Sequence, residues 1–376
     1  MQKGLTMQKK KLLYNLTLAL SSIIITLLVI EVGIRLVLPS QRHLAMYQRS
    51  GSDNHVLMPN LNLRYNQKEF SHSVITNSAG FRNKEELVNK DIILFIGDSF
   101  TFGSGVDEEY HYSHIFGKLL NWNEKKFNIY NAGVPGYSTI DELIYIRGLI
   151  NRGLDIKKVL LGIDISDFNE NLLFPVYEIK DGYLVFSTKD KKGAVVSGLN
   201  FLAANSELVN FLYYRVVHSS VLKNYLASIF SNLKYLHINL PDRNLQLFAR
   251  QKNDISEKKL TVFKEHLTKI IELCKASNIE LYVYYLPMIQ EIYKDNYQNT
   301  LATYSLKEED FNLTFLNGYI EQICTENGAR FLDIKKDLLR SNSERLYYFV
   351  DQHFTRYGNL ITGISIYNGY QDDKRH

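Results

Sequence analysis

The feature that most constrains the fold is a short apolar run that ends at a glycine-flanked serine. Residues 92–96 read Ile-Ile-Leu-Phe-Ile, and Gly97, Asp98 and Ser99 follow directly. Such a run is typical of a buried β-strand. Open α/β sheets bind their ligands at the carboxyl ends of their strands, so the Ser99 hydroxyl would lie at a ligand-binding edge. A serine there is a candidate nucleophile if a histidine can reach it.

Three further clusters rich in polar residues and glycine occur along the chain. Residues 131–138 and 162–171 each follow an apolar strand, and residues 351–359 span a loop-to-helix transition that contains Asp351 and His353. The carboxyl ends of parallel strands meet at one edge of a sheet. We therefore expect all four clusters to lie together, with His353 near the serine.

Apolar and amphipathic segments alternate from residue 91 onward, which indicates the fold class. The predicted strands are 91–96, 127–131, 158–163, 279–286 and 330–334, and the predicted helices are 110–120, one from about 138, 259–277, 313–326 and one from about 355. Strands that alternate with helices over short connections imply an α/β fold with a parallel, doubly wound sheet of five strands.

In order and rough spacing, the four clusters resemble the motif blocks of the SGNH, or GDSL-type, hydrolase family. That family has a serine in a Gly-Asp-Ser block, then a glycine block, an Asn-Asp block, and an Asp and a His near the C-terminus. The resemblance covers residues 91–370. It implies the flavodoxin-like SGNH hydrolase fold, with strands in the order 2-1-3-4-5, and a serine esterase activity. We expect no cofactor.

The resemblance also implies a role for each matching residue. Ser99 matches the nucleophile, His353 the general base and Asp351 the carboxylate that orients the histidine. The backbone N–H groups of Ser99 and Gly136 match the oxyanion donors. This chemistry is self-consistent, because a serine hydroxyl attacks only when an oriented imidazole takes its proton. Each preorganised oxyanion donor lowers the barrier by roughly 3 kcal/mol.

The third block departs from the family pattern. The family has Asn before Asp, and its side chain is a third oxyanion donor, whereas here Ser166 stands before Asp167. A hydroxyl can donate, but it has a shorter reach. The third donor is therefore Ser166, or else the amide of Asn169 or Asn171. Together with Asp98, these residues complete the candidate site.

The fourth block is shortened from Asp-x-x-His to Asp-x-His at residues 351–353. This spacing is similar to that of the alginate O-acetyltransferase-like branch, which moves acyl groups onto polysaccharides. The likeness favours O-acyl chemistry on a carbohydrate.

The N-terminus predicts a membrane anchor. Residues 12–30 carry no charge and are about long enough to cross a bilayer as a helix. Lysines at positions 3, 9, 10 and 11 favour a cytoplasmic N-terminus, so the rest would be periplasmic or at the cell surface. An uncleaved signal anchor is favoured over a cleaved signal peptide. The expected organisation is a tail at 1–11, the span, a juxtamembrane connector at 31–90 and the hydrolase-like domain at 91–370.

Composition limits the partners. The net charge is +4, but without the four N-terminal lysines 40 basic residues face 40 acidic ones, so a nucleic-acid partner has no electrostatic support. Cys274 and Cys324 recur with apolar residues at helical spacing, which favours two buried thiols over a disulfide. Histidine and cysteine spacings do not match a metal site, and none is expected.

Two segments outside the alternation have structural interpretations. Residues 77–83 resemble a turn with an anchoring Phe81, which we interpret as a clasp on the sheet edge, with Arg82 as a substrate ligand the less favoured alternative. Residues 172–258 form an insertion too long for a plain loop. Helical patterns within 199–230 predict a cap over the rim of the sheet. The alternative is packing on the outer face of the sheet or on the membrane.

The leading functional hypothesis is a membrane-anchored esterase or O-acyltransferase that acts through an acyl-enzyme. Its substrate would be an acylated carbohydrate or lipid of the cell envelope, and a membrane acyltransferase is a candidate partner. A different class remains open, namely a domain with this fold but no turnover that binds glycan or scaffolds an acyl-transfer complex. A third alternative is a lipase or thioesterase that acts on soluble acyl chains.

Overall fold

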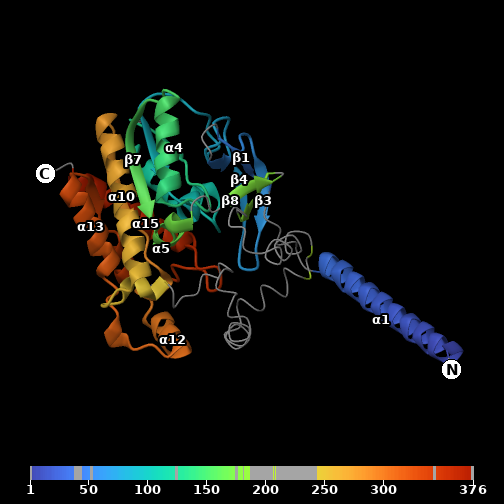
Figure 1. Cartoon of the computed structure of the whole chain (residues 1–376). Coiled ribbons are helices and arrows are strands. Elements are labelled where there is room, and N and C mark those ends of the chain that lie inside the picture. Colours follow the sequence, from blue (N-terminus) through green and yellow to red (C-terminus); the bar gives the residue numbers. More distant parts are fainter. Residues whose placement is uncertain are drawn as a thin grey trace. The chain divides into compact units, whose positions relative to one another are not determined.

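The chain forms two compact units, residues 1–42 with 188–238 and residues 43–187 with 239–376. The computed structural model describes residues 2–37, 45–50, 54–122, 126–173, 177–180, 182–186, 206, 208, 244–341 and 344–373. In the first unit, helix α1 (Gln2–Val37) includes the apolar stretch Tyr14–Ile34 (Figure 1). Its 21 residues would measure roughly 31 Å, which matches the hydrocarbon core of a bilayer. By length and composition, α1 is a candidate membrane span that overlaps the predicted one.

A five-stranded parallel sheet forms the centre of the second unit. In chain order its strands are β5 (Ile92–Ile96), β6 (Asn128–Asn131), β7 (Ile156–Ile163), β10 (Glu280–Tyr285) and β11 (Arg330–Leu332). They lie side by side as β11-β10-β7-β5-β6, and all four neighbouring pairs are parallel. Numbered along the chain, this is the order 2-1-3-4-5. The predicted α/β class, the five parallel strands and their order are confirmed.

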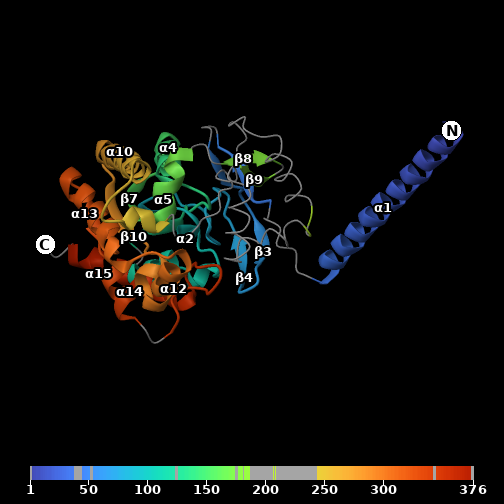
Figure 2. The same ribbon diagram turned by 60° about the horizontal axis from the view of Figure 1, so that its bottom comes forward.

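Helices cover both faces of the sheet, which explains why its strands read as continuous apolar runs. One core contains Ile92, Leu94 and Ile96 with side chains of α4 (Thr139–Asn151), α10 (Asp254–Ala276) and α13 (Phe315–Asn327). The other contains Ile93 and Phe95 with side chains of α3 (Tyr112–Leu120), α14 (Lys335–Arg340) and α15 (Arg356–Asp373). Figure 2 shows α4 and α10 on one side of the sheet and α14 and α15 on the other.

Most predicted elements are confirmed to within a few residues. The helix expected from about residue 138 is α4, which Ser138 and Asp141 start with a reciprocal capping box. Helix α10 begins five residues before the expected start because the Asn253 side chain accepts the Ser256 N–H. Cys274 and Cys324 are free and buried, as predicted.

The connector contains two hairpins that the sequence analysis did not identify. Strand β1 (Tyr47–Arg49) pairs with β2 (His55–Leu57), and β3 (Asn62–Asn66) pairs with β4 (Ser71–Ile75), both antiparallel. Two short helices, α11 (Ile289–Ile292) and α12 (Lys294–Tyr304), were also not predicted.

Only part of the predicted insertion is described. It includes a hairpin of β8 (Tyr177–Lys180) and β9 (Tyr183–Phe186), and a 3-10 turn at Gln246–Phe248. Leu247 and Phe248 are fully buried in the core that contains α10 and α13. The helical patterns within 199–230 lie almost wholly outside the described residues, and with them the predicted cap.

Arg82 fastens the connector to the segment that follows the serine. Its guanidinium, 1% exposed, donates to the backbone carbonyls of Phe102, Gly103, Val106 and Ser73. Burial lowers the pKa of Arg82 to about 10, so the side chain still carries its charge at neutral pH. These bonds give Arg82 a structural role, as the clasp interpretation expects, and its guanidinium is occupied by backbone carbonyls.

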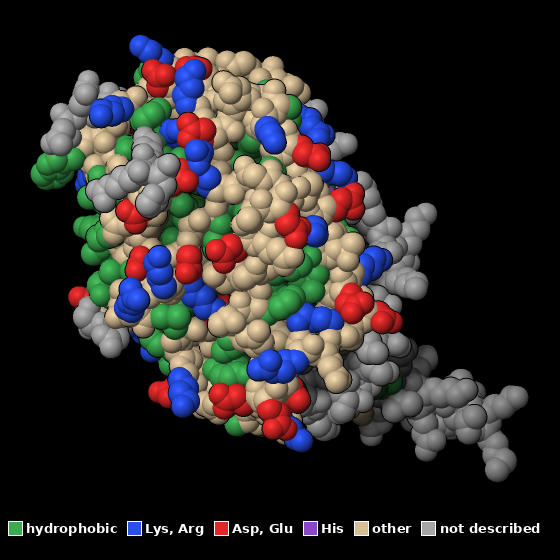
Figure 3. Space-filling view, turned by 90° about the vertical axis from the view of Figure 1, so that its left-hand side faces the viewer, with side chains coloured by type: hydrophobic (Ala, Val, Ile, Leu, Met, Phe, Trp, Pro, Cys, Tyr) green, Lys and Arg blue, Asp and Glu red, His purple; other side chains and the backbone are tan. Residues whose placement is uncertain are grey.

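The outer surface of the helical layers carries both signs of charge. Figure 3 shows acidic and basic side chains interspersed over one face. Ion pairs on helix α10 include Lys264–Glu326 and Lys269–Glu265. This face therefore offers no large area of one sign.

Candidate active site

A sharp turn at the end of β5 presents the serine. Helix α2 (Ser99–Phe102) begins one residue after Asp98, whose carboxylate caps it by accepting the Phe100 N–H at 2.9 Å. Gly97 is required by close approach, because a Cβ there would lie 2.1 Å from the Thr101 hydroxyl oxygen and 2.9 Å from a backbone carbonyl of β7. The turn leaves Ser99 partly exposed at the carboxyl edge of the sheet.

The structure brings together the serine, histidine and aspartate that the sequence analysis selected. The Ser99 Oγ lies 2.8 Å from the His353 Nε2, and the His353 Nδ1 lies 2.5 Å from an Asp351 carboxylate oxygen. The side chains of His353 and Asp351 keep 22% and 30% of their exposure, so a substrate can reach them. This arrangement has the hydrogen-bond order of a nucleophile, a base and an orienting carboxylate.

The surrounding charges set the protonation of the pair. Burial alone would lower the pKa of His353, but Asp351, Asp98 and Asp164 outweigh burial and raise it above its ordinary value. Burial would raise the pKa of Asp351, but His353 outweighs that effect and holds it below its ordinary value. Asp351 is therefore an anion at neutral pH, and the site stabilises an imidazolium.

The expected oxyanion donors are the backbone N–H groups of Ser99 and Gly136, in the turns that follow β5 and β6. Gly136 has a φ of +81°, in the turn between β6 and α4. Among the described residues, no backbone carbonyl accepts the Gly136 N–H. Gly133 in the same turn packs against the backbone of α2, where a Cβ would lie 2.3 Å from the Phe102 nitrogen. The glycine block and the serine turn are therefore in direct contact.

The three candidates for a third donor have different partners. The Ser166 hydroxyl donates to Asp164 at 2.6 Å and lies 3.5 Å from Asp98. The Asn169 amide donates to Asn244 and to the carbonyl of Ile165. The Asn171 amide donates to the hydroxyl of Thr139, which also donates to Asp167. The structure thus joins Ser166, and not the asparagines, to the neighbour of the serine.

Asp164 is a site residue that the sequence analysis missed. It is the N-cap of α5 (Ile165–Glu170), and Asp167 closes a capping box by accepting the Asp164 N–H at 2.9 Å. The signal was present in the sequence, since Asp-x-x-Asp after an apolar strand is close to the capping-box pattern. Asp167 therefore has a structural role at the start of α5, while Asp164 faces Ser166 and Asp98.

Asp98 and Asp164 belong to a larger set of carboxyl groups behind the serine. We call this set the acidic cluster; it consists of Asp98, Asp141, Glu142, Asp164, Asp167 and Glu170. Burial raises the pKa of every member, to about 6 for Asp141 and about 7 for Asp164. Repulsion between members adds to burial for most of them. Both carboxyl oxygens of Glu142 are buried without a hydrogen-bond partner among the described residues.

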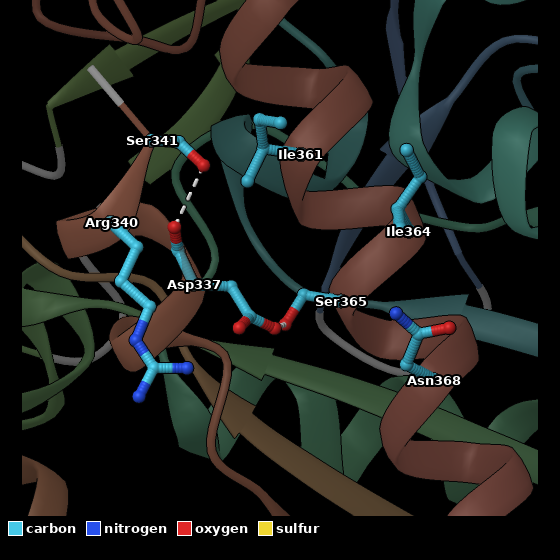
Figure 4. A pocket seen from close by; sticks show the side chains of 7 residues that line it. All are labelled: Asp337, Arg340, Ser341, Ile361, Ile364, Ser365 and Asn368. Carbon is cyan, nitrogen blue, oxygen red and sulfur yellow. Dashed lines mark hydrogen bonds between the residues drawn. The ribbon is translucent and has the colours of Figure 1, made fainter.

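A pocket of about 260 Å³ lies between α14 and α15, away from these groups. Figure 4 shows its lining, in which Asp337 accepts hydrogen bonds from Ser341 and Ser365. The hydroxyl groups of both serines are thus satisfied by Asp337, and no predicted site residue lines the pocket. The serine edge of the sheet is the better candidate site.

Comparison with protein-family models and with curated protein sequences gives no match. Similar solved structures include a lipolytic G-D-S-L family member from Veillonella parvula (11% identity, TM-score 0.38, 74% of this chain and 96% of the other). They also include an esterase from Pseudoalteromonas sp. (10%, 0.40, 76% and 100%) and an acetylxylan esterase from Geobacillus stearothermophilus (12%, 0.39, 76% and 96%).

The structure of this chain alone defines its fold and the geometry of its site. It is an α/β protein of flavodoxin-like strand order, with a serine, a histidine and an aspartate in hydrogen-bond sequence at the ligand-binding edge. These are the features that the resemblance to SGNH hydrolases implies.

The acidic cluster predicts a pH-dependent stability. A carboxyl whose pKa is raised by folding stabilises the protein only at low pH, and the stability is lost as pH rises towards the folded pKa. Glu142→Gln removes such a group without changing its shape. We expect the variant to raise Tm relative to wild type, and by more at pH 8 than at pH 5.5.

Circular dichroism melting of the full chain in detergent measures this difference. Glu272→Gln, on the exposed side of α10, is the matched control. A Glu142→Gln effect of equal size at both pH values, or a lower Tm at pH 8, would contradict the raised pKa of Glu142.

Proposed function

We propose that the chain is a serine esterase or O-acyltransferase that acts through an acyl-enzyme on an ester of an envelope glycan or lipid. The observation that carries the proposal is the continuous hydrogen-bond path from Ser99 through His353 to Asp351. An imidazole held in one tautomer beside a serine hydroxyl is the arrangement that makes the hydroxyl a nucleophile.

In the first half of the reaction, His353 Nε2 takes the proton of Ser99 as its Oγ attacks the ester carbonyl carbon. The tetrahedral intermediate carries its negative charge on the former carbonyl oxygen, which the Ser99 and Gly136 N–H groups would bind. The imidazolium then returns the proton to the departing alcohol oxygen as the C–O bond breaks. An acyl group remains on Ser99.

In the second half, His353 takes a proton from the group that attacks the acyl-enzyme. Water yields the free acid, whereas a sugar hydroxyl yields a new ester, and in both cases the proton returns to Ser99 Oγ. The shortened Asp-x-His spacing supports transfer to a carbohydrate as one outcome of the same intermediate.

The neighbouring carboxyl groups affect the oxyanion. Asp98 lies 3.1 Å from the Ser99 Oγ, and Asp164 reaches the site through Ser166. Carboxylates there would repel the developing negative charge. Burial raises the pKa of both groups, which favours their neutral forms and so reduces the repulsion. Ser166 is the third oxyanion donor in this proposal, since its hydroxyl can turn from Asp164 to the substrate.

Location is the second part of the proposal. Helix α1 would be an uncleaved signal anchor, with the α/β unit in the periplasm or at the cell surface. The support is the 21-residue apolar stretch Tyr14–Ile34 and the lysines that precede it.

A pair of C-terminal fusions checks the orientation. Alkaline phosphatase folds only outside the cytoplasm, so we expect it to be active when it is fused after residue 376. Green fluorescent protein fused at the same position should not fluoresce, because it would be exported unfolded. The opposite pattern would reverse the topology.

Two alanine variants test the shared step. Ser99→Ala and His353→Ala should each lower kcat for release of acetate or fatty acid from envelope fractions by about 10⁴-fold or more, and the double variant should be little worse. When two residues act in the same catalytic step, removing the second lowers kcat little further once the first has been removed. Ser341→Ala, in the pocket of Figure 4, is the matched control and should keep wild-type kcat. Losses that multiply in the double variant would show that the two residues do not share a step.

A further inference from the structure

A single carboxylate from the connector holds the loop that carries the aspartate and the histidine. Glu69 accepts three consecutive backbone N–H groups, those of Phe349 at 2.9 Å, Val350 at 2.8 Å and Asp351 at 2.7 Å. Successive backbone N–H groups that point to one place form a concave binding site for an anion. Hydrogen bonds to a charged acceptor are about twice as strong as neutral ones.

The loop has a narrow base and an unusual backbone conformation. Tyr347 and Phe354 form a bridge at its base, and the Tyr348 N–H donates to the His353 carbonyl at 2.9 Å. Gln352, between the aspartate and the histidine, has a φ of +68°, in the left-handed region that disfavours side chains other than glycine. Only one residue separates the aspartate from the histidine, and its left-handed conformation turns their two side chains towards each other. A backbone of this kind persists only when contacts outside it hold it in place.

Glu69 lies at the turn of the β3–β4 hairpin, which is itself fixed on two sides. The Gln67 N–H donates to the Phe70 carbonyl and closes the turn. The Phe70 ring packs on the ring of Tyr348 with their centres 4.8 Å apart. The Tyr348 hydroxyl donates to the carbonyl of Gly105, in the segment that follows the serine turn. Glu69 is therefore held at a fixed place between the loop and that segment.

We propose that Glu69 is a positioning residue of the active site, an internal anion that fills the nest at residues 349–351 and thereby sets Asp351 against His353. The role rests on the proposed function, because it acts through the aspartate and does not touch the substrate. Asp351 links Glu69 directly to the histidine, because its backbone N–H donates to Glu69 and its carboxylate is hydrogen-bonded to His353.

Glu69→Ala in the full chain, in detergent, with p-nitrophenyl acetate as substrate, tests the proposal. A misplaced orienting group should lower kcat by about 10- to 100-fold. KM should stay within about twofold, because the proposed role acts on proton transfer from Ser99 and adds no contact to the substrate. Sodium formate should then restore kcat at least about tenfold by filling the vacated nest. Sodium chloride at the same ionic strength should restore much less.

The matched control is Glu86→Ala, which removes a carboxylate of the same connector that accepts hydrogen bonds from Ser78. It should keep wild-type kcat and show no formate effect. If the alanine variant fails to fold, Glu69→Gln replaces it. Glutamine keeps one acceptor oxygen for the three N–H groups, so kcat should fall below that of wild type, and an unchanged kcat would overturn the role.

Three outcomes would overturn the role of Glu69 alone: wild-type kcat in Glu69→Ala, an equal loss in Glu86→Ala, or a loss that formate does not reverse. A wild-type chain without turnover would count against the proposed function itself.

Discussion

The site depends on one hydrogen bond between residues 254 positions apart in the chain, from Ser99 to the imidazole of His353 at 2.8 Å. The bond requires the turn after β5 and the loop before α15 to meet at one edge of the sheet. Gly97 permits the turn, because no Cβ fits there. Arg82 is hydrogen-bonded to the end of α2, and Glu69 is hydrogen-bonded to the loop that carries His353. The connector therefore fixes the segments on both sides of the Ser99–His353 bond.

The same edge concentrates negative charge. Asp98 and Asp164 of the acidic cluster are buried, and the positive charge that lowers the pKa of both is that of His353. Interacting carboxyl groups in a low-dielectric site cannot all ionise. Carboxyl groups of the cluster that are ionised stabilise the imidazolium of His353, and those that are protonated do not repel the oxyanion. The balance between the two is thus a property of the whole cluster and of no single residue.

Much of this organisation could be predicted from the sequence. Strands such as β5 are buried on both faces, so they read as unbroken apolar runs, and the polar clusters at their ends marked the site. The strand order needed the family resemblance, since alternation alone does not specify it. The β3–β4 hairpin was missed because its strands are short and mix polar with apolar residues.

Other parts of the site could not be predicted for a different reason. Glu69 and its three N–H partners are 280 to 282 residues apart in the chain, and backbone donors leave no trace in the residue types. Asp164 was missed because the family pattern matches the third block to Ser166 and Asp167. The capping box at 164–167 was a local signal that explains both aspartates.

The most direct measurement is labelling of the full chain in detergent with a serine-reactive phosphonate, followed by peptide mass spectrometry. We expect one adduct, on the peptide that contains Ser99, absent in Ser99→Ala and formed much more slowly in His353→Ala. A folded chain that takes no label, or takes it on another residue, would contradict the assignment of Ser99 as an activated nucleophile.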